Sequence, residues 1–382
     1  MKIVVREFDA EKDYQGAQKV EAMSDVGGSG SGISLTTDLL GDLTSRVRHS
    51  PPYLMLVAEV TYSEEEEETV RTEIVGVIRG CVKVVTCGKK TDTQITSTKV
   101  AYILGLRVSP NHRRMGVALE LVTRLEQWFR EMAGAEYAYV AIEKDNEASV
   151  SLFTEKCGYA VFRSLSILVH PVFRHHINTP RQVVIRKLES HQAEELYRLH
   201  FSTTDFFPLD INTILDNPLC LGTFLAEELG GESWAAVSIW NCMEVFRLEV
   251  TGVSKMKRGL AKVTRVLDRM FSWLKIPSFP NLFAPFGCHF LFGITGEGPL
   301  ATDLLTALCT HAHNTAREGG CELVVTEVGS SDPLKSGIPH WNVLSCDADL
   351  WCIKRLSKDG GGVALWTKTD LGQTIFVDPR EV

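Results

Sequence analysis

The sequence lacks any apolar run long enough to cross a membrane as a helix, although 44% of its 382 residues are hydrophobic. Such a helix needs about 20 consecutive apolar residues. The composition therefore excludes a helical membrane protein and indicates a soluble one with a sizeable core. The N-terminal MKIVVREFD carries charges where a secretory signal would be apolar. We therefore expect an intracellular protein.

Disulfide and metal-binding patterns are also missing. The ten cysteines include no CxxC pair, and without a secretory signal we expect them to be reduced thiols. The adjacent His175 and His176 would need further carboxylates or cysteines nearby to form a metal site, and their surroundings in the sequence offer none. The sequence therefore predicts no metal cofactor.

A basic stripe is absent as well. The chain carries 40 Lys and Arg against 48 Asp and Glu, which gives a formal net charge of −8. This balance provides no general attraction to nucleic acid or to an anionic membrane. We therefore expect small molecules or proteins as partners, no direct nucleic-acid or membrane partner, and we leave self-association open.

The most informative feature that is present is a strand followed by a basic turn and a helix. Residues 102–108 are apolar, Pro110 opens the turn, and apolar residues recur at helical spacing after Gly116. Amide groups at a helix N-terminus have no intrahelical partner and favour an anion. Arg113 and Arg114 add positive charge there. The simpler alternative is an ordinary strand-to-helix connection with solvated arginines.

This turn resembles the acyl-CoA pyrophosphate loop of the GCN5-related N-acetyltransferases (GNAT). Arg113-x-x-Gly116-x-Ala118 matches the family pattern of Gln or Arg, then Gly, then Gly or Ala. A second predicted strand, at residues 138–142, leads to a segment similar to the family's second motif. Two motifs in this order are more specific than either alone. The second motif matches at Asn146, Ala148, Leu152, Phe153, Cys157, Gly158 and Tyr159.

The resemblance implies an acetyl-CoA-dependent N-acetyltransferase whose acceptor is an amine, on a small molecule or on a protein such as a histone. The pyrophosphate would bind the amides of residues 114–118, and the pantetheine arm would lie beside residues 106–108 like an added strand. A backbone amide of that strand would stabilise the oxyanion. The cofactor-binding residues implied are Leu106, Val108, Arg113, Arg114, Met115, Gly116, Val117, Ala118, Asn146 and Phe153.

The catalytic residues of the family are not all present. Phe153 occupies the position where many members have a Tyr that acts as general acid, and a phenyl ring cannot protonate a thiolate. The strand at 102–108 also lacks the Glu that many members use as a base. Glu143, on the same strand face as Tyr139, and Tyr102 are the remaining candidates. Each has a simpler alternative, namely a surface carboxylate for Glu143 and core packing for Tyr102.

The second part of the chain repeats the order of the first. Residues 184–189 echo residues 4–9, and a strand, a glycine turn and a helix recur at residues 290–317. We therefore predict an α/β (α+β) fold with tandem GNAT-like domains, each a mixed, mostly antiparallel sheet flanked by helices. The predicted boundaries are 1–175 for the first domain, which carries the acetyl-CoA loop, and 181–382 for the second.

The second copy differs where chemistry would take place. Its turn has no arginine and carries Glu297 at the place of a phosphate, and Pro299 removes one backbone donor. We predict that this copy is degenerate and does not bind CoA. Three polar segments are predicted to be connections: the glycine/serine tract at 27–32, five glutamates at 64–68, and residues 89–99.

Further segments extend the resemblance over nearly the whole chain, to the plant HOOKLESS-type N-acetyltransferase-like proteins. That family implies an acetyltransferase that regulates hormone-responsive differential growth, with the nucleus as its expected location and the cytoplasm as the alternative. Phe153 favours a second hypothesis, a non-catalytic regulator or scaffold that keeps the fold and binds CoA. The matching segments are residues 34–57, 201–204, 287–299, 338–341 and 376–381.

Overall fold

The structure, a computed structural model, describes residues 2–356 and 373–382 except 24–33, 64–69, 92–93, 181, 254, 272, 274 and 276. The glycine/serine tract at 27–32 and the acidic run at 64–68 lie outside the described residues. The α-helices are α1 (Ala10–Met23), α2 (Val117–Glu131), α3 (Glu147–Ser151), α4 (Ser190–Phe201), α5 (Ile211–Leu215), α6 (Lys255–Met270) and α7 (Ala301–Glu318). The strands are β1 (Lys2–Glu7), β2 (Ser34–Asp38), β3 (Tyr53–Ser63), β4 (Val70–Thr91), β5 (Gln94–Val108), β6 (Tyr137–Glu143), β7 (Ala160–Pro171), β8 (Val183–Leu188), β9 (Asp205–Pro208), β10 (Cys220–Glu228), β11 (Trp234–Asn241), β12 (Arg247–Thr251), β13 (Cys288–Glu297), β14 (Leu323–Gly329) and β15 (Cys346–Arg355).

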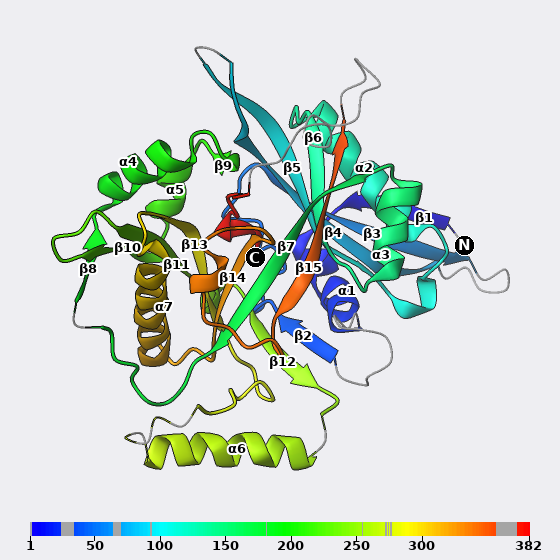
Figure 1. The fold of residues 1–382 in the computed structure, drawn as a ribbon. Coiled ribbons are helices and arrows are strands. Elements are labelled where there is room, and N and C mark those ends of the chain that lie inside the picture. The colour runs from blue at the N-terminus through cyan, green and yellow to red at the C-terminus, as the bar shows by residue number, and fades with distance from the viewer. Residues whose placement is uncertain are drawn as a thin grey trace.

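One mixed sheet runs through the described part of the molecule. Its strand order is β1-β3-β4-β5-β6-β15-β7-β14-β13-β11-β10-β8, with β9 paired to β4. Figure 1 shows β7, β14 and β15 in the centre, with the remaining strands of the two halves on either side. The fold is therefore α/β with a mostly antiparallel sheet flanked by helices, as the sequence predicts.

The strand order repeats itself from the two edges inward. The series β1-β3-β4-β5-β6 corresponds to β8-β10-β11-β13-β14, and in each series only the last two strands are parallel. Each half then takes its next strand from the other half, because β15 pairs with β6 and β7 pairs with β14. The tandem arrangement is thus present with exchanged last strands. The boundary between residues 175 and 181 stays a prediction, since the sheet continues across it.

The parallel pair in each half diverges after a short stretch of pairing. β5 and β6 pair only up to Ile103 and Val140, and the left-handed Gly105 (φ 61°) follows at once on β5. In the second half β13 and β14 pair up to Leu291 and Thr326, and Gly293 (φ 63°) follows. The unpaired ends beyond these residues are called the first fork and the second fork below.

One amphipathic helix covers the sheet beside each fork. In α2 the residues Val117, Leu121, Leu125 and Phe129 recur at helical spacing and are buried against the strands of the first half. Burial of each such side chain stabilises the fold by about 1.5–3 kcal/mol. In α7 a similar apolar row packs on the second half. Both helices therefore begin at the open end of their own fork.

The prediction of a polar connection at residues 89–99 is wrong. β4 continues to Thr91 and β5 already begins at Gln94, with Lys90 opposite Ile95. The threonines and the isoleucine of this stretch favour extended backbone, and cross-strand hydrogen bonds satisfy polar backbone groups that a loop would leave to water. A long hairpin therefore replaces the predicted loop.

Candidate active site

A cleft of about 1040 Å³ occupies the first fork. The ends of β5 and β6 form its sides, and the N-terminal turns of α2 and α3 border its entrance. The edge of β5 that faces β6 has no strand partner after Ile103, so its backbone groups are available to an extended ligand. The lining residues are Met23, Leu106, Arg107, Val108, Pro110, His112, Arg113, Arg114, Gly116, Val117, Ala118, Leu119, Glu143, Asp145, Asn146, Glu147, Ala148, Ser149, Ser151, Leu152 and Lys156.

The N-terminus of α2 is shaped as an anion site. Gly116 caps the helix in the left-handed conformation (φ 84°), and a Cβ added to it would meet no atom within 4 Å. Arg114 also has a positive φ of 63°, a strained conformation that proteins retain mainly at functional positions. Open space therefore lies directly before amide groups that have no intrahelical acceptor.

The second wall of the cleft begins with a capped helix. The side chain of Asn146 accepts a hydrogen bond from the amide of Ser149 at 3.2 Å and so starts α3. The helix continues as a π-helical turn, Leu152–Lys156, a distortion that is frequent at functional sites. Exposed Arg113, Arg114 and Lys156 bring positive charge to the cleft, and the exposed acids Asp145 and Glu147 line it as well.

Tyr102 lies on the sheet face opposite α2. Its ring packs against Tyr139 with centroids 4.9 Å apart, and both side chains are buried. Burial and the nearby Glu381 carboxylate raise the pKa of Tyr102 well above its ordinary value. The side chain is therefore a neutral phenol at physiological pH, which donates a proton or a hydrogen bond more readily than it accepts a proton.

Two carboxylates on this same face are not evident from the sequence. Asp349 on β15 lies directly opposite Glu143 in the β6–β15 pairing and is hydrogen-bonded to Glu327 on β14. Burial raises the pKa of Asp349 to about 6, with a further contribution from the Glu143 charge. Burial and the charge of Asp349 raise the pKa of Glu327 well above its ordinary value. Burial thus favours the protonated form of both carboxyl groups, and Asp349 can gain or lose a proton near pH 6.

This carboxylate pair connects the two catalytic candidates of the sequence analysis. Glu143 faces Asp349 across the strands, and Glu327 and Asp349 both contribute to the electrostatic environment of Tyr102. The indole of Trp351 donates a hydrogen bond to Glu327 at 2.9 Å. Glu143 and the pair thus lie around the end of β6, whereas Tyr102 lies opposite Tyr139, earlier on the same strand.

Known proteins match this arrangement. The model of the acetyltransferase (GNAT) family matches residues 37–159, which contain both motifs. The probable N-acetyltransferase HLS1 of Arabidopsis thaliana is 53% identical over 99% of this chain and 99% of its own length. The chain belongs to the GNAT acetyltransferase family. A second Arabidopsis protein, the probable N-acetyltransferase HLS1-like, is 52% identical over 99% of both chains, and the acetyl transferase GW6a of Oryza sativa subsp. japonica is 38% identical over 100% of this chain and 98% of its own.

Solved structures share the fold of this GNAT chain. Saccharomyces cerevisiae N-myristoyltransferase with bound myristoyl-CoA superposes with a TM-score of 0.53 at 11% identity, over 92% of this chain and 79% of the other. At this identity the likeness shows the fold alone. In the part of the chain that the structure describes, no helix is long and apolar enough to cross a membrane, and no cluster of metal-ligating side chains is found.

Most of the predicted site residues of this GNAT chain lie together in the first fork. Leu106, Val108, Arg113, Arg114, Gly116, Val117, Ala118, Asn146 and Glu143 all line the cleft. Met115, Tyr102 and Phe153 are not among its lining residues. Three further lining residues and the neighbouring Asp349–Glu327 pair are not predicted from the sequence. The three residues are Arg107, Met23 and Lys156.

Phe153 is buried in the core and is not among the residues that line the cleft. Its side chain is buried, and its ring meets Tyr159 edge-on with centroids 5.3 Å apart. The π-helical turn carries this ring into the core beneath α2. The nearby Cys157 is also buried, which raises the pKa of its thiol to about 11 and leaves it without nucleophilic thiolate at neutral pH.

The second fork of this GNAT chain is filled by its own residues. A Cβ added to Gly298, at the turn before α7, would lie 2.6 Å from the Ser233 hydroxyl, and that hydroxyl accepts a hydrogen bond from the amide of Leu300. The segment from Thr374 to Val377 lies between the ends of β13 and β14 and leaves a space of only about 20 Å³. The space that is open before α2, at Gly116, is therefore occupied by side chains at the corresponding position before α7.

Proposed function

We propose that this chain is an acetyl-CoA-dependent N-acetyltransferase that holds its cosubstrate in the first fork. The observation that carries the proposal is the open space before the left-handed Gly116 at the N-terminus of α2, continuous with the diverging ends of β5 and β6. Membership of the GNAT family supports acyl-CoA use, and the close plant relatives are named as probable N-acetyltransferases.

The residues of the fork fit an acyl-CoA in three places. The amides that follow Arg114 would bind the pyrophosphate, with the guanidinium groups of Arg113 and Arg114 as counter-charges. The unpaired edge of β5 at residues 106–108 would hydrogen-bond the pantetheine arm. Lys156 at the mouth supplies a further cation for the adenosine phosphates. The cosubstrate supplies an activated acyl group, and the chain positions it beside the acceptor.

The Asp349–Glu327 pair provides a place for the proton that an amine must lose. An amine attacks a thioester only when it is neutral, and a carboxylate whose pKa is about 6 can accept a proton near neutral pH. Glu143 lines the cleft and is opposite Asp349, so it is placed to pass the proton inward. We propose that Glu143 contacts the acceptor amine and takes its proton. Asp349 would position Glu143 and accept the proton from it. Tyr102 would stay neutral and act as a proton or hydrogen-bond donor.

The acceptor side of the cleft carries charge of both signs. Arg107 and Glu143 face it, and Glu21 on α1 lies 3.9 Å from Arg107. We propose an amine on a protein, with histone tails as one class, since a lysine or N-terminal ammonium would be drawn to Glu143. The same proposal places the chain in control of plant differential growth, with action in the nucleus, on the strength of the HOOKLESS-type resemblance.

One observation favours a second function. Among the described residues that line the cleft there is no tyrosine or cysteine, so no phenol within the cleft itself is available to protonate the departing CoA thiolate. A regulator that binds CoA without transferring its acyl group would keep the Gly116 site and lose the pH-dependent chemistry around Asp349. The two functions therefore differ in turnover and not in binding.

The test is to measure binding and turnover separately. Calorimetric titration of purified protein with acetyl-CoA, CoA and myristoyl-CoA should give one site, with acetyl-CoA bound at least as tightly as myristoyl-CoA. Release of free CoA thiol should then follow addition of histone peptides or small amines, and Gly116→Glu should abolish both signals. Binding without thiol release from any acceptor would support the regulator, and absence of binding would contradict both functions.

A further inference from the structure

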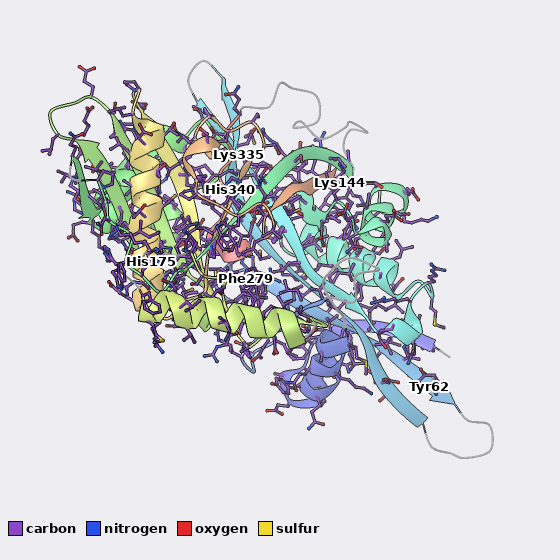
Figure 2. The ribbon with its side chains drawn as sticks, turned by 60° about the horizontal axis from the view of Figure 1, so that its bottom comes forward. Tyr62, Lys144, His175, Phe279, Lys335 and His340 are labelled. Atoms are coloured by element: carbon purple, nitrogen blue, oxygen red, sulfur yellow. The ribbon has the colours of Figure 1, made fainter. Side chains whose placement is uncertain are left out.

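The helix α6 sits on the molecule through charged side chains. Asp268 is fully buried and accepts hydrogen bonds from His175, from Ser278 and from the backbone amide of Arg174, at 2.5–2.7 Å. Arg265, one turn earlier on the same face, pairs with Glu322. Figure 2 shows α6 along the outside of the molecule, with His175 and Phe279 beside it. The inward face of the helix is therefore polar, and these hydrogen bonds and the ion pair fix it against the rest of the molecule.

The outward face of α6 is apolar. Val263, Val266, Leu267 and Met270 follow at spacings of three, one and three residues and form a single stripe, which Trp273 extends beyond the helix. All five side chains are exposed, Met270 by 67% and Trp273 by 73%. A surface helix of a soluble protein normally buries its apolar stripe and exposes its charges. Here that arrangement is reversed, and an exposed apolar row of this kind marks a binding surface.

The charge around this stripe is positive in a chain that is negative overall. Between residues 255 and 275 the sequence contains Lys255, Lys257, Arg258, Lys262, Arg265, Arg269 and Lys275, and one acid, Asp268. Asp268 and Arg265 are both engaged by partners on the inward side of the helix. The whole chain has a formal net charge of −8, so α6 is a local basic site on an acidic protein.

We propose that α6 is the docking helix for an acidic partner protein with an apolar groove, of the chemistry that calcium-loaded EF-hand sensors present. The apolar stripe has the helical spacing that such grooves recognise, and its lysines and arginines match an acidic rim. Figure 1 shows α6 below the two halves, at the outside of the molecule, so the exposed side of the helix is accessible to a groove. This inference does not depend on the acetyltransferase activity.

Two other occupants fit the observations less well. A second copy of this chain that docked through the same helix would bring two basic segments together, which is unfavourable. An anionic lipid surface would attract α6 but would face the rest of a molecule whose net charge is −8. A single protein groove contacts only the helix and its local charges.

The experiment uses the full chain and calmodulin as the probe. Calorimetric titration should show binding to calcium-loaded calmodulin and none in excess chelator. Val266→Asp with Met270→Asp should weaken the affinity at least tenfold, and Arg269→Glu should weaken it several-fold with a reduced salt dependence. Leu199→Asp, which changes an equally exposed leucine on α4, should leave the affinity unchanged. All these side chains are exposed, so the thermal transition of each variant should match the parent protein.

Four results would overturn the inference. The first is absence of binding to calcium-loaded calmodulin at micromolar concentrations, and the second is undiminished affinity in the Val266→Asp, Met270→Asp variant. The third is binding to vesicles of phosphatidylcholine with phosphatidylserine that this variant loses, because the occupant would then be a lipid surface. The fourth is self-association in ultracentrifugation that the variant abolishes, because the occupant would then be a second copy.

Discussion

The two forks of this molecule have the same backbone plan and opposite contents. Each follows a short parallel pair, each contains a left-handed glycine on its first strand, and each opens toward the N-terminus of a covering helix. The first fork contains a cleft of about 1040 Å³, and the second retains about 20 Å³. The difference arises from side chains: Ser233 occupies the turn before α7, and Phe376 with its neighbours fills the space between the strands. The shared backbone plan alone therefore does not create an open cleft.

The largest expected effect is a loss of stability on substitution in the second fork. Phe376 is buried among Phe201, Phe207 and Phe292, with ring centroids 5.3–6.3 Å away. Phe376→Ala removes these contacts and leaves a cavity, so we expect the free energy of unfolding to fall by about 3–5 kcal/mol. Denaturant titration measures this loss, and Leu199→Ala at an exposed site should change it by less than about 0.5 kcal/mol.

The same variant also tests whether filling alone closes the second fork. CoA titration of Phe376→Ala should still give one bound CoA per chain, because Ser233 continues to occupy the turn before α7. A second bound CoA would show instead that the phenyl ring is the main barrier.

The next effect is on the pH dependence of stability, through the carboxylate pair beside the first fork. The folded pKa of Asp349, about 6, lies above its ordinary value of 3.8, so the folded protein binds this proton more tightly than the unfolded chain does. The resulting stabilisation is fully present below pH 3.8 and is lost as the pH rises through 6. It amounts to about 3 kcal/mol. In Asp349→Asn this part of the pH dependence should disappear from denaturant titrations.

A conservative change at an exposed carboxylate serves as the control for that measurement. Glu232→Gln, on the turn before β11, should leave the pH dependence of stability intact. If Asp349→Asn retains the parental profile, the pair does not hold a proton in this range. The proton-accepting role proposed for it would then be wrong.

The third effect is on CoA binding in the first fork. Gly116→Glu places a charged side chain into the space before α2, in a backbone conformation that only glycine adopts easily. We expect at least about a hundredfold loss of CoA affinity, about 2.7 kcal/mol. Gly230→Glu is the matched control, because Gly230 is also left-handed (φ 76°) with no atom near its Cβ position and lies away from the cleft. Equal losses in the two variants would indicate strain rather than a phosphate site.

The smallest expected effect is that of a single guanidinium group. Arg113→Ala should weaken CoA binding about tenfold at low salt, or about 1.4 kcal/mol, and the difference should shrink as salt screens the charge. Arg124→Ala, on the exposed side of α2, should leave the affinity unchanged. A loss for Arg113→Ala that does not vary with salt would assign this side chain a packing role.

Sequence reasoning succeeded where the determinants are local. The turn at Gly116 and the motif that begins at Asn146 each depend on a short stretch of sequence, so local patterns identify them. The Asp349–Glu327 pair escaped notice because it forms only when β15 enters the sheet beside β6, about 200 residues away in the chain. No short pattern records such an exchange of strands.

Two local conformations depend on tertiary contacts that the sequence does not reveal. The polar stretch at 89–99 is a hairpin because the long partner strand satisfies its backbone. Phe153 stands at the motif position where many family members have a Tyr, and its ring is buried in the core, edge-on to Tyr159. In both cases tertiary contacts, and not local composition, decide the conformation.

The exchange of β7 and β15 also has a consequence for how the chain folds during synthesis. The sheet of the first half cannot be completed until residues 346–355 have left the ribosome, because β15 must lie between β6 and β7. Until then the edges of two apolar strands remain unpaired, which is a known route to aggregation. The halves of this protein are therefore expected to become native together, and a fragment that ends at the first half would lack both its neighbouring strand and Asp349.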